Sequence, residues 1–179
     1  MSAGCGLDRR QWTEKLAALG EQLRLLGAPA TLEIIGAWPV IEAGLEGRTS
    51  LDLDVWMPGS DADRTALAAA CLAAGLDFDP TEETDRPYLQ LVQAGIVSIP
   101  DHQPVPAGRW GALTIVTPPP AALAAMKLIR AEPKDLADVL FLCSRHGLTR
   151  DEVAACARRI PDLHARQTAE ENLVYLDVP

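Results

Sequence analysis

The sequence has few cysteines, few aromatic residues and no long apolar run. Only four of its 179 residues are cysteine, and no two form the Cys-x-x-Cys pair of a structural zinc site or a dithiol redox centre. Pro, Gly or a charged residue interrupts every apolar stretch before it is long enough to span a bilayer. The first ten residues contain no apolar signal-peptide core. We therefore expect a cytoplasmic protein without a membrane span.

Positive charge is also scarce. The chain has 16 Lys and Arg against 25 Asp and Glu, which gives a formal net charge of −9. Contacts to phosphate groups need clustered basic residues, so this balance disfavours general binding to a polyanion. A hydrophobic content of 48% is nevertheless sufficient for an ordinary globular core.

Apolar periodicity predicts mixed strands and helices up to about residue 117, and helices alone after that. The predicted helices cover 9–26, 40–43, 64–74, 121–130, 134–145, 149–161 and 163–176. The predicted strands cover 31–35, 51–56, 88–92, 95–99 and 113–116. This order is typical of an α+β fold. We expect an α/β core with an N-terminal helix over residues 1–117, and a helical region over 118–179 packed on it.

The most informative stretch is 51–56, where two acids alternate with apolar residues. In a strand, Asp52 and Asp54 share one face while the apolar residues share the other. Two like charges so close together are costly unless water or a cation takes up their charge, and Mg²⁺ suits such oxygens. Two simpler interpretations stay open at this point, namely a solvated edge strand and an ion pair with Arg48.

The segment before this stretch strengthens the metal hypothesis. A strand ends at Ile35, Gly36 turns the chain, and a helix with Pro39 in its first turn follows. A helix N-terminus offers free N–H groups and partial positive charge to an anion, and glycine lets the backbone approach that anion closely. Together with the acidic strand, these parts predict a site for a nucleoside triphosphate and Mg²⁺.

These segments resemble the first motif of the nucleotidyltransferase superfamily, which has the fold of DNA polymerase β. That motif is a strand, Gly-Gly or Gly-Ser, a helix and R-x-[ST]-x-D-[ILV]-D; here it reads Gly36-Ala37 and then the heptapeptide 48–54. Small bacterial members related to the toxins of AbiE-type toxin–antitoxin systems also carry a helical lysine and a K-D-x-x-D segment. Lys127 and the pentapeptide 134–138 match these features.

The resemblance implies a fold, an activity and a set of site residues. The expected fold is a nucleotidyltransferase-like mixed sheet with flanking helices. The expected activity is Mg²⁺-dependent transfer of a nucleoside monophosphate to a protein or RNA hydroxyl, in a toxin-like protein with an antitoxin partner. The implied metal ligands are Asp52 and Asp54. The implied nucleotide-binding residues are Gly36, Ala37, Ser50 and Lys127. The implied catalytic acids are Asp52, Asp54 and Asp135, with Asp138 on the same helical face as Asp135.

Two departures from the family pattern keep an alternative open. Ala37 stands where the family has Gly or Ser, and Gln90 stands on the strand where active members have a third acid. The alternative is a catalytically silent nucleotidyltransferase fold that binds a nucleotide or a protein. A further alternative is an α+β domain unrelated to nucleotide chemistry, in which Gly36 does not lie beside the acidic strand.

Overall fold

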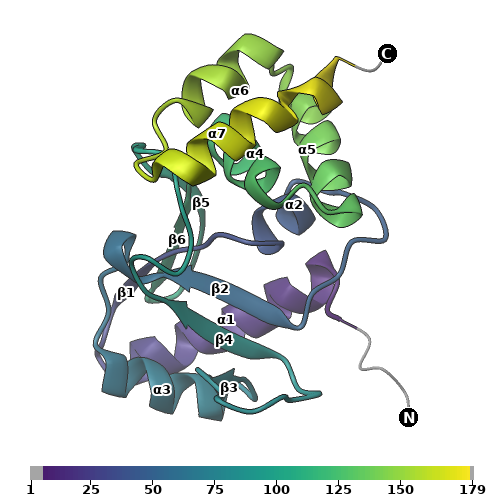
Figure 1. The fold of residues 1–179 in the computed structure, drawn as a ribbon. Helices are drawn as coiled ribbons and strands as arrows, with labels where there is room; N and C mark the ends of the chain where they lie inside the picture. The colour runs from purple at the N-terminus through teal and green to yellow at the C-terminus, as the bar shows by residue number, and fades with distance from the viewer. Residues whose placement is uncertain (1–5, 178–179) are drawn as a thin grey trace. The chain divides into compact units, whose positions relative to one another are not determined.

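A computed structural model describes residues 6–177 and shows two compact units (Figure 1). The first unit contains the residues up to Ala94 together with Pro104–Thr117, and the second contains Gly95–Gln103 and the residues from Pro118 onward. Strands and helices alternate in the first unit and helices dominate the second, so the α+β class is confirmed. The segment 95–103 groups with the helical unit, which resumes at Pro118.

The first unit contains two three-stranded sheets, in the orders β1-β6-β5 and β2-β4-β3. Its elements are α1 (Arg9–Leu25), β1 (Ala30–Glu33), α2 (Trp38–Glu42), β2 (Asp52–Trp56), the 3-10 turn η1 (Met57–Gly59), α3 (Arg64–Ala73), β3 (Asp77–Phe78), β4 (Tyr88–Val92), β5 (Val105–Trp110) and β6 (Leu113–Thr117). All strand pairs are parallel except β5 with β6. An antiparallel bridge between Ile34 and Val55 links the two sheets.

Helix α1 begins and packs as its sequence predicts. The Asp8 carboxylate accepts a hydrogen bond from the Gln11 N–H, and the Gln11 side chain accepts one from the Asp8 N–H, which completes a capping box. Apolar residues at spacings of three and four form one buried face, made of Trp12, Leu16, Leu19 and Leu23.

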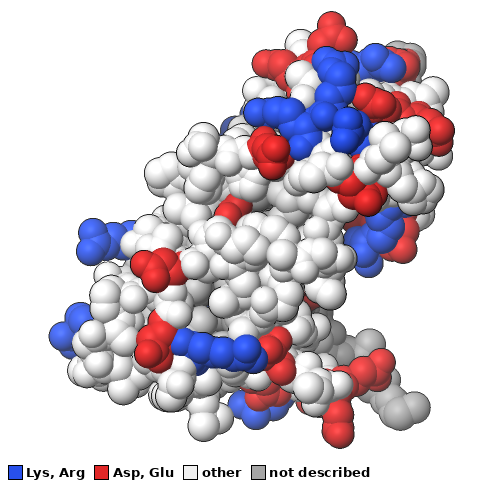
Figure 2. Space-filling view, turned by 60° about the vertical axis from the view of Figure 1, so that its left-hand side comes forward, with Lys and Arg blue, Asp and Glu red and all other residues white. Residues whose placement is uncertain are grey.

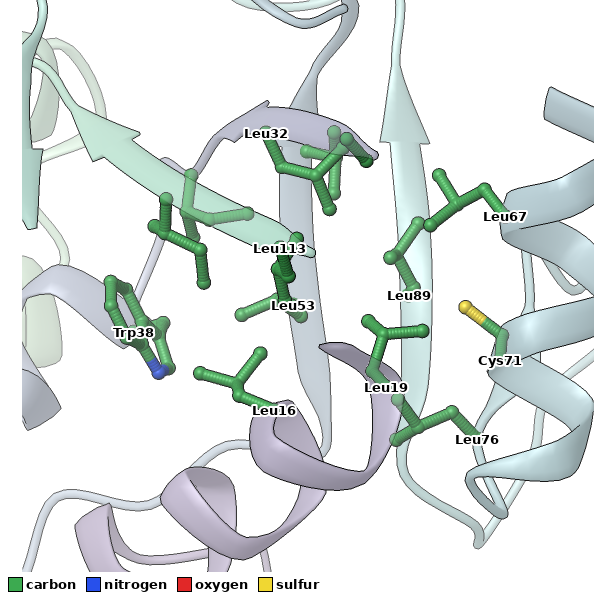
Figure 3. Packing of buried hydrophobic residues seen from close by; sticks show 14 of the residues in the cluster. Leu16, Leu19, Leu32, Trp38, Leu53, Leu67, Cys71, Leu76, Leu89 and Leu113 are labelled. Carbon is green, nitrogen blue, oxygen red and sulfur yellow. The ribbon is translucent and has the colours of Figure 1, made fainter. Parts of the chain in front are cut away.

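The core of the first unit lies against one face of β2 and β4 (Figure 3). Leu53 and Leu89 are fully buried there, facing Leu16 and Leu19 of α1. Burying each of these leucines contributes roughly 1.5–3 kcal/mol. Cys71 of α3 is also buried, and burial raises the pKa of its thiol to about 12, so it acts as a small hydrophobic residue. Because the apolar side chains of β2 face this core, its acids face the opposite side.

The second unit is a group of four helices: α4 (Pro120–Arg130), α5 (Pro133–His146), α6 (Arg150–Ala157) and α7 (Leu163–Glu171), followed by the 3-10 turn η2 (Asn172–Leu176). Helix α4 contacts each of the other three. A capping box of Thr149 and Glu152 opens α6. No helix within residues 6–177 has the length and apolarity needed to cross a membrane.

Two strand predictions are wrong for identifiable reasons. Residues 95–99, predicted as a strand, form a turn and irregular chain, and Gly95 has a φ of +86°. The Pro-rich segment 101–108, predicted as a loop, contributes residues 105–108 to β5, where the pairing register shifts between Pro106 and Gly108. The ring of Trp110 lies where a side chain at 108 would project, so only glycine fits this irregular strand.

Candidate functional site

The polar side of β2 and β4 carries the acidic residues singled out by the sequence. Asp52 pairs in register with Tyr88, and Asp54 pairs with Gln90. Residues paired in this way on parallel strands point to the same side of the sheet. We call these four half-buried side chains, Asp52, Asp54, Tyr88 and Gln90, the acidic face.

Gly36 lies directly against this face. Its φ is +71°, and a Cβ at this position would lie 1.9 Å from Oδ2 of Asp54. The Ile35 N–H also donates to the backbone carbonyl of Asp54 at 2.9 Å. The structure therefore brings the glycine bend and the acidic strand together.

The helix that follows Gly36 is shorter than a strong anion site requires. Helix α2 has five residues, and Ala37 at its N-cap makes no side-chain hydrogen bond. A helix dipole grows with helix length, so contact with phosphate would depend on the half-buried Gly36 more than on α2, since Ala37 is buried in the core. Trp38 is 1% exposed and packs edge-on against Trp110, with the two ring centroids 6.4 Å apart, so it belongs to the core.

Ser50 orients one of the two acids. Its hydroxyl donates to Oδ1 of Asp52. The backbone of Ser50 exchanges two hydrogen bonds with Leu7, at 2.8 and 3.2 Å, so the serine itself is held in place. Ser50 thus contacts the carboxylate of Asp52, whereas the family resemblance implied a role in nucleotide binding.

Gln90 lies on the strand where the family pattern has a third acid. Its Nε2 donates to Oδ1 of Asp79 at 2.8 Å, and Asp79 also accepts from the Leu91 N–H at 3.1 Å and binds Arg64 at 2.9 Å. No group of three His, Cys, Asp or Glu residues suited to a metal occurs within residues 6–177. Mg²⁺ commonly takes one or two carboxylates and completes its shell with water and phosphate oxygens, so Asp52 and Asp54 fit a nucleotide-bound Mg²⁺.

Tyr88 also belongs to the acidic face. The sequence predicted that this residue lies in a strand, but it predicted no role for it in the site. Partial burial and the negative charges of Asp52 and Asp54 raise the pKa of its phenol. Its side chain and that of Gln90 line a groove of about 410 Å³, whose other wall is formed by residues 80–84. The sequence did contain a sign of this position. In the predicted strand 88–92, residues 88 and 90 lie two apart and therefore share one face.

The other predicted site residues, Lys127 and Asp135, belong to the second unit. Nζ of Lys127 lies 2.7 Å from Oδ2 of Asp138 and 4.0 Å from Oδ1 of Asp135. Arg130 donates to both oxygens of Asp135, at 2.6 and 2.7 Å. Burial alone would raise the pKa of the Asp135 carboxyl, but its hydrogen bonds and charge interaction with Arg130 lower it overall.

This ionic network ties α4 to α5. Lys127 is 8% exposed, Asp135 1% and Asp138 0%. A buried charge is tolerated when it is paired and hydrogen-bonded, and these side chains meet that condition. The contacts give Lys127 and Asp135 a structural role in the helical unit, whatever further role they have.

Five of the predicted site residues therefore come together in the first unit: Gly36, Ala37, Ser50, Asp52 and Asp54. Comparison of the chain with family models, curated proteins and solved structures finds no match. The function is accordingly argued from the geometry of the acidic face.

Proposed function

We propose that the chain is a cytoplasmic, Mg²⁺-dependent nucleotidyltransferase-like protein that binds a nucleoside triphosphate at the acidic face and transfers its nucleoside monophosphate to a hydroxyl. One observation carries the proposal: Gly36, in a left-handed conformation, lies against the carboxylate of Asp54. A glycine at this point lets the Asp54 carboxylate lie against the bend, so that a polyphosphate held at the two acids would meet backbone and no side chain there. This is the arrangement that the resemblance to the superfamily implies.

Each residue of the site has a defined part in the proposal. Asp52 and Asp54 would hold Mg²⁺, and Ser50 fixes the orientation of Asp52 through its hydrogen bond. The metal would neutralise phosphate charge and polarise the α-phosphorus. The reaction forms a bond from the acceptor oxygen to the α-phosphorus and breaks the bond to the leaving pyrophosphate, while the hydroxyl proton passes to solvent.

The charge of the first unit favours a protein acceptor over RNA. This unit contains 15 of the 25 acidic residues but only 8 of the 16 Lys and Arg. On the face of the molecule drawn in Figure 2, blue side chains lie among red ones and do not form a continuous basic surface. An RNA acceptor would be repelled by such a unit, whereas a protein hydroxyl would not.

Titration of the chain with each nucleoside triphosphate, with and without Mg²⁺, tests the binding step. Asp52→Asn and Asp54→Asn should each weaken Mg²⁺-dependent binding by more than about tenfold, because each removes a charged ligand oxygen. Glu14→Gln, which alters an exposed acid of α1, is the matched control and should bind as the native chain does. Absence of binding by the native chain at millimolar nucleotide would contradict the proposal.

A second candidate function is binding without transfer. Gln90 favours it, because an amide tied to Asp79 stands where a third carboxylate would be needed and cannot supply negative charge. A triphosphate labelled on its α-phosphate separates the two candidates, since only transfer leaves label on an acceptor. If the native chain binds nucleotide without transfer, Gln90→Glu should create activity and Gln90→Asn should not.

The toxin-like role and the antitoxin partner are proposed on the resemblance alone. Expression of the native chain in bacteria should then arrest growth. Asp54→Asn should relieve the arrest at equal protein level. Equal growth of cells that express the two forms would remove the toxin-like role but leave the chemical proposal standing.

A further inference from the structure

Tyr88 presents a hydroxyl group on the acidic face itself. It pairs in register with Asp52 on the neighbouring parallel strand, so both side chains leave the sheet on the same side. Its ring lines the 410 Å³ groove beside Gln90, and the residue is only half-buried. Tyr88 therefore belongs both to the groove and to the face that carries the two acids.

Two neighbouring hydroxyl groups are already engaged. The Ser50 hydroxyl donates to Asp52, and the Thr84 hydroxyl donates to Oδ2 of Asp77 at 2.8 Å and accepts from the Arg86 N–H at 3.1 Å. By contrast, the Tyr88 hydroxyl makes no hydrogen bond to any residue in the range 6–177. It is therefore the hydroxyl of the acidic face that can accept a group without first giving up a protein contact.

We propose that Tyr88 is itself an acceptor for the nucleotidyl group, so that the chain modifies its own acidic face. This inference rests on the proposed function, because it needs a nucleoside triphosphate bound with Mg²⁺ at Asp52 and Asp54. The phenol oxygen bonds to the α-phosphorus, the bond from that phosphorus to pyrophosphate breaks, and the phenol proton leaves to solvent. The product is a tyrosine phosphodiester that carries one nucleoside monophosphate.

The modification would also limit the activity of the site. A nucleotide on Tyr88 places a phosphodiester charge next to Asp52 and occupies the groove lined by Tyr88 and Gln90. The added negative charge would repel a second triphosphate, and the attached nucleotide would fill the space that it needs. The modified chain should therefore bind Mg²⁺ and nucleotide much more weakly than the unmodified chain.

The test uses the full chain, Mg²⁺ and each of the four nucleoside triphosphates, with the intact mass as readout. The native chain should gain the mass of one nucleoside monophosphate with its preferred nucleotide, and peptide mapping should place this mass on Tyr88. The chain has two tyrosines, so Tyr175→Phe, in η2 of the second unit, is a matched control. Tyr175→Phe should be labelled like the native chain, whereas Tyr88→Phe should remain unlabelled.

The outcomes separate this inference from the proposed function. Nucleotide binding with no added mass, or with the mass on another residue, overturns the role of Tyr88 and leaves the binding site intact. Absence of Mg²⁺-dependent nucleotide binding overturns both. A labelling rate constant that does not change with protein concentration supports modification within one chain.

Discussion

Gly36→Ala tests the contact on which the proposed site depends. The substitution puts a Cβ into a backbone with a φ of +71°, at 1.9 Å from Oδ2 of Asp54. Ordinary contact begins at 3.4 Å, so the carboxylate has to move by about 1.5 Å. The variant should therefore lose stability and displace a proposed metal ligand in the same step.

The chain supplies a matched control for the backbone part of this effect. Gly47 has a φ of +73°, and a Cβ there would meet nothing within 4 Å. Gly47→Ala should therefore lower the free energy of unfolding by about 1–2 kcal/mol, which is the strain of an L-residue in the left-handed conformation. Gly36→Ala should lower the free energy of unfolding by the same amount and by about 0.5–1.5 kcal/mol more, because the Asp54 side chain is forced from its preferred rotamer.

Tryptophan fluorescence during urea unfolding measures this difference, because all four tryptophans belong to the first unit. Nucleotide titration then measures the effect on the site. Gly36→Ala should bind Mg²⁺ and nucleotide at least about tenfold more weakly, since a ligand displaced by an ångström or more loses its geometry. Equal stability and equal nucleotide binding of Gly36→Ala and Gly47→Ala would refute the reasoning.

Two further predictions concern the buried ionic network of the helical unit. Lys127→Met removes the ammonium that lies 2.7 Å from the fully buried Asp138, so the free energy of unfolding, followed by circular dichroism, should fall by about 3 kcal/mol. The double variant with Asp138→Leu should recover much of that loss, and no loss in the single variant would contradict the network's role. The pKa of Asp135 lies below its ordinary value of 3.8, so its stabilising contribution is complete above that value and disappears as the pH falls through the native pKa. Arg130→Ala should raise this native pKa and move the midpoint of acid unfolding to higher pH, and an unchanged midpoint would show that Arg130 is not the cause.

Most of the elements were predictable, because they depend on local chemistry. The prediction for residues 88–92 matches β4 at both ends, and the helix boundaries at Asp8 and Thr149 follow from their capping boxes. The wrong predictions concern segments in which the local sequence preference differs from the conformation that strand pairing imposes. Strand β5 contains Pro106 and Gly108, residues that favour a loop, yet pairing with β6 holds the segment extended.

The site was predictable in part. Alternation along the strand places Asp52 and Asp54 on one face, and the structure agrees. Lys127 and Asp135 illustrate the opposite case, because a helical lysine near an acid looks the same in the sequence whether it faces a ligand or another helix. Only burial distinguishes the two situations, and here it places both side chains in the α4–α5 contact.

The sequence by itself determined the class of the fold, the main helices and the shared face of the two acids, because these follow from helical and strand periodicity and from capping residues. The tertiary structure alone decided that β4 lies beside β2, that Gly36 touches Asp54, and that Tyr88 stands opposite Asp52. These facts come from contacts between segments far apart in the chain, where strand pairing and the packing of the core select one arrangement among many that local preferences permit.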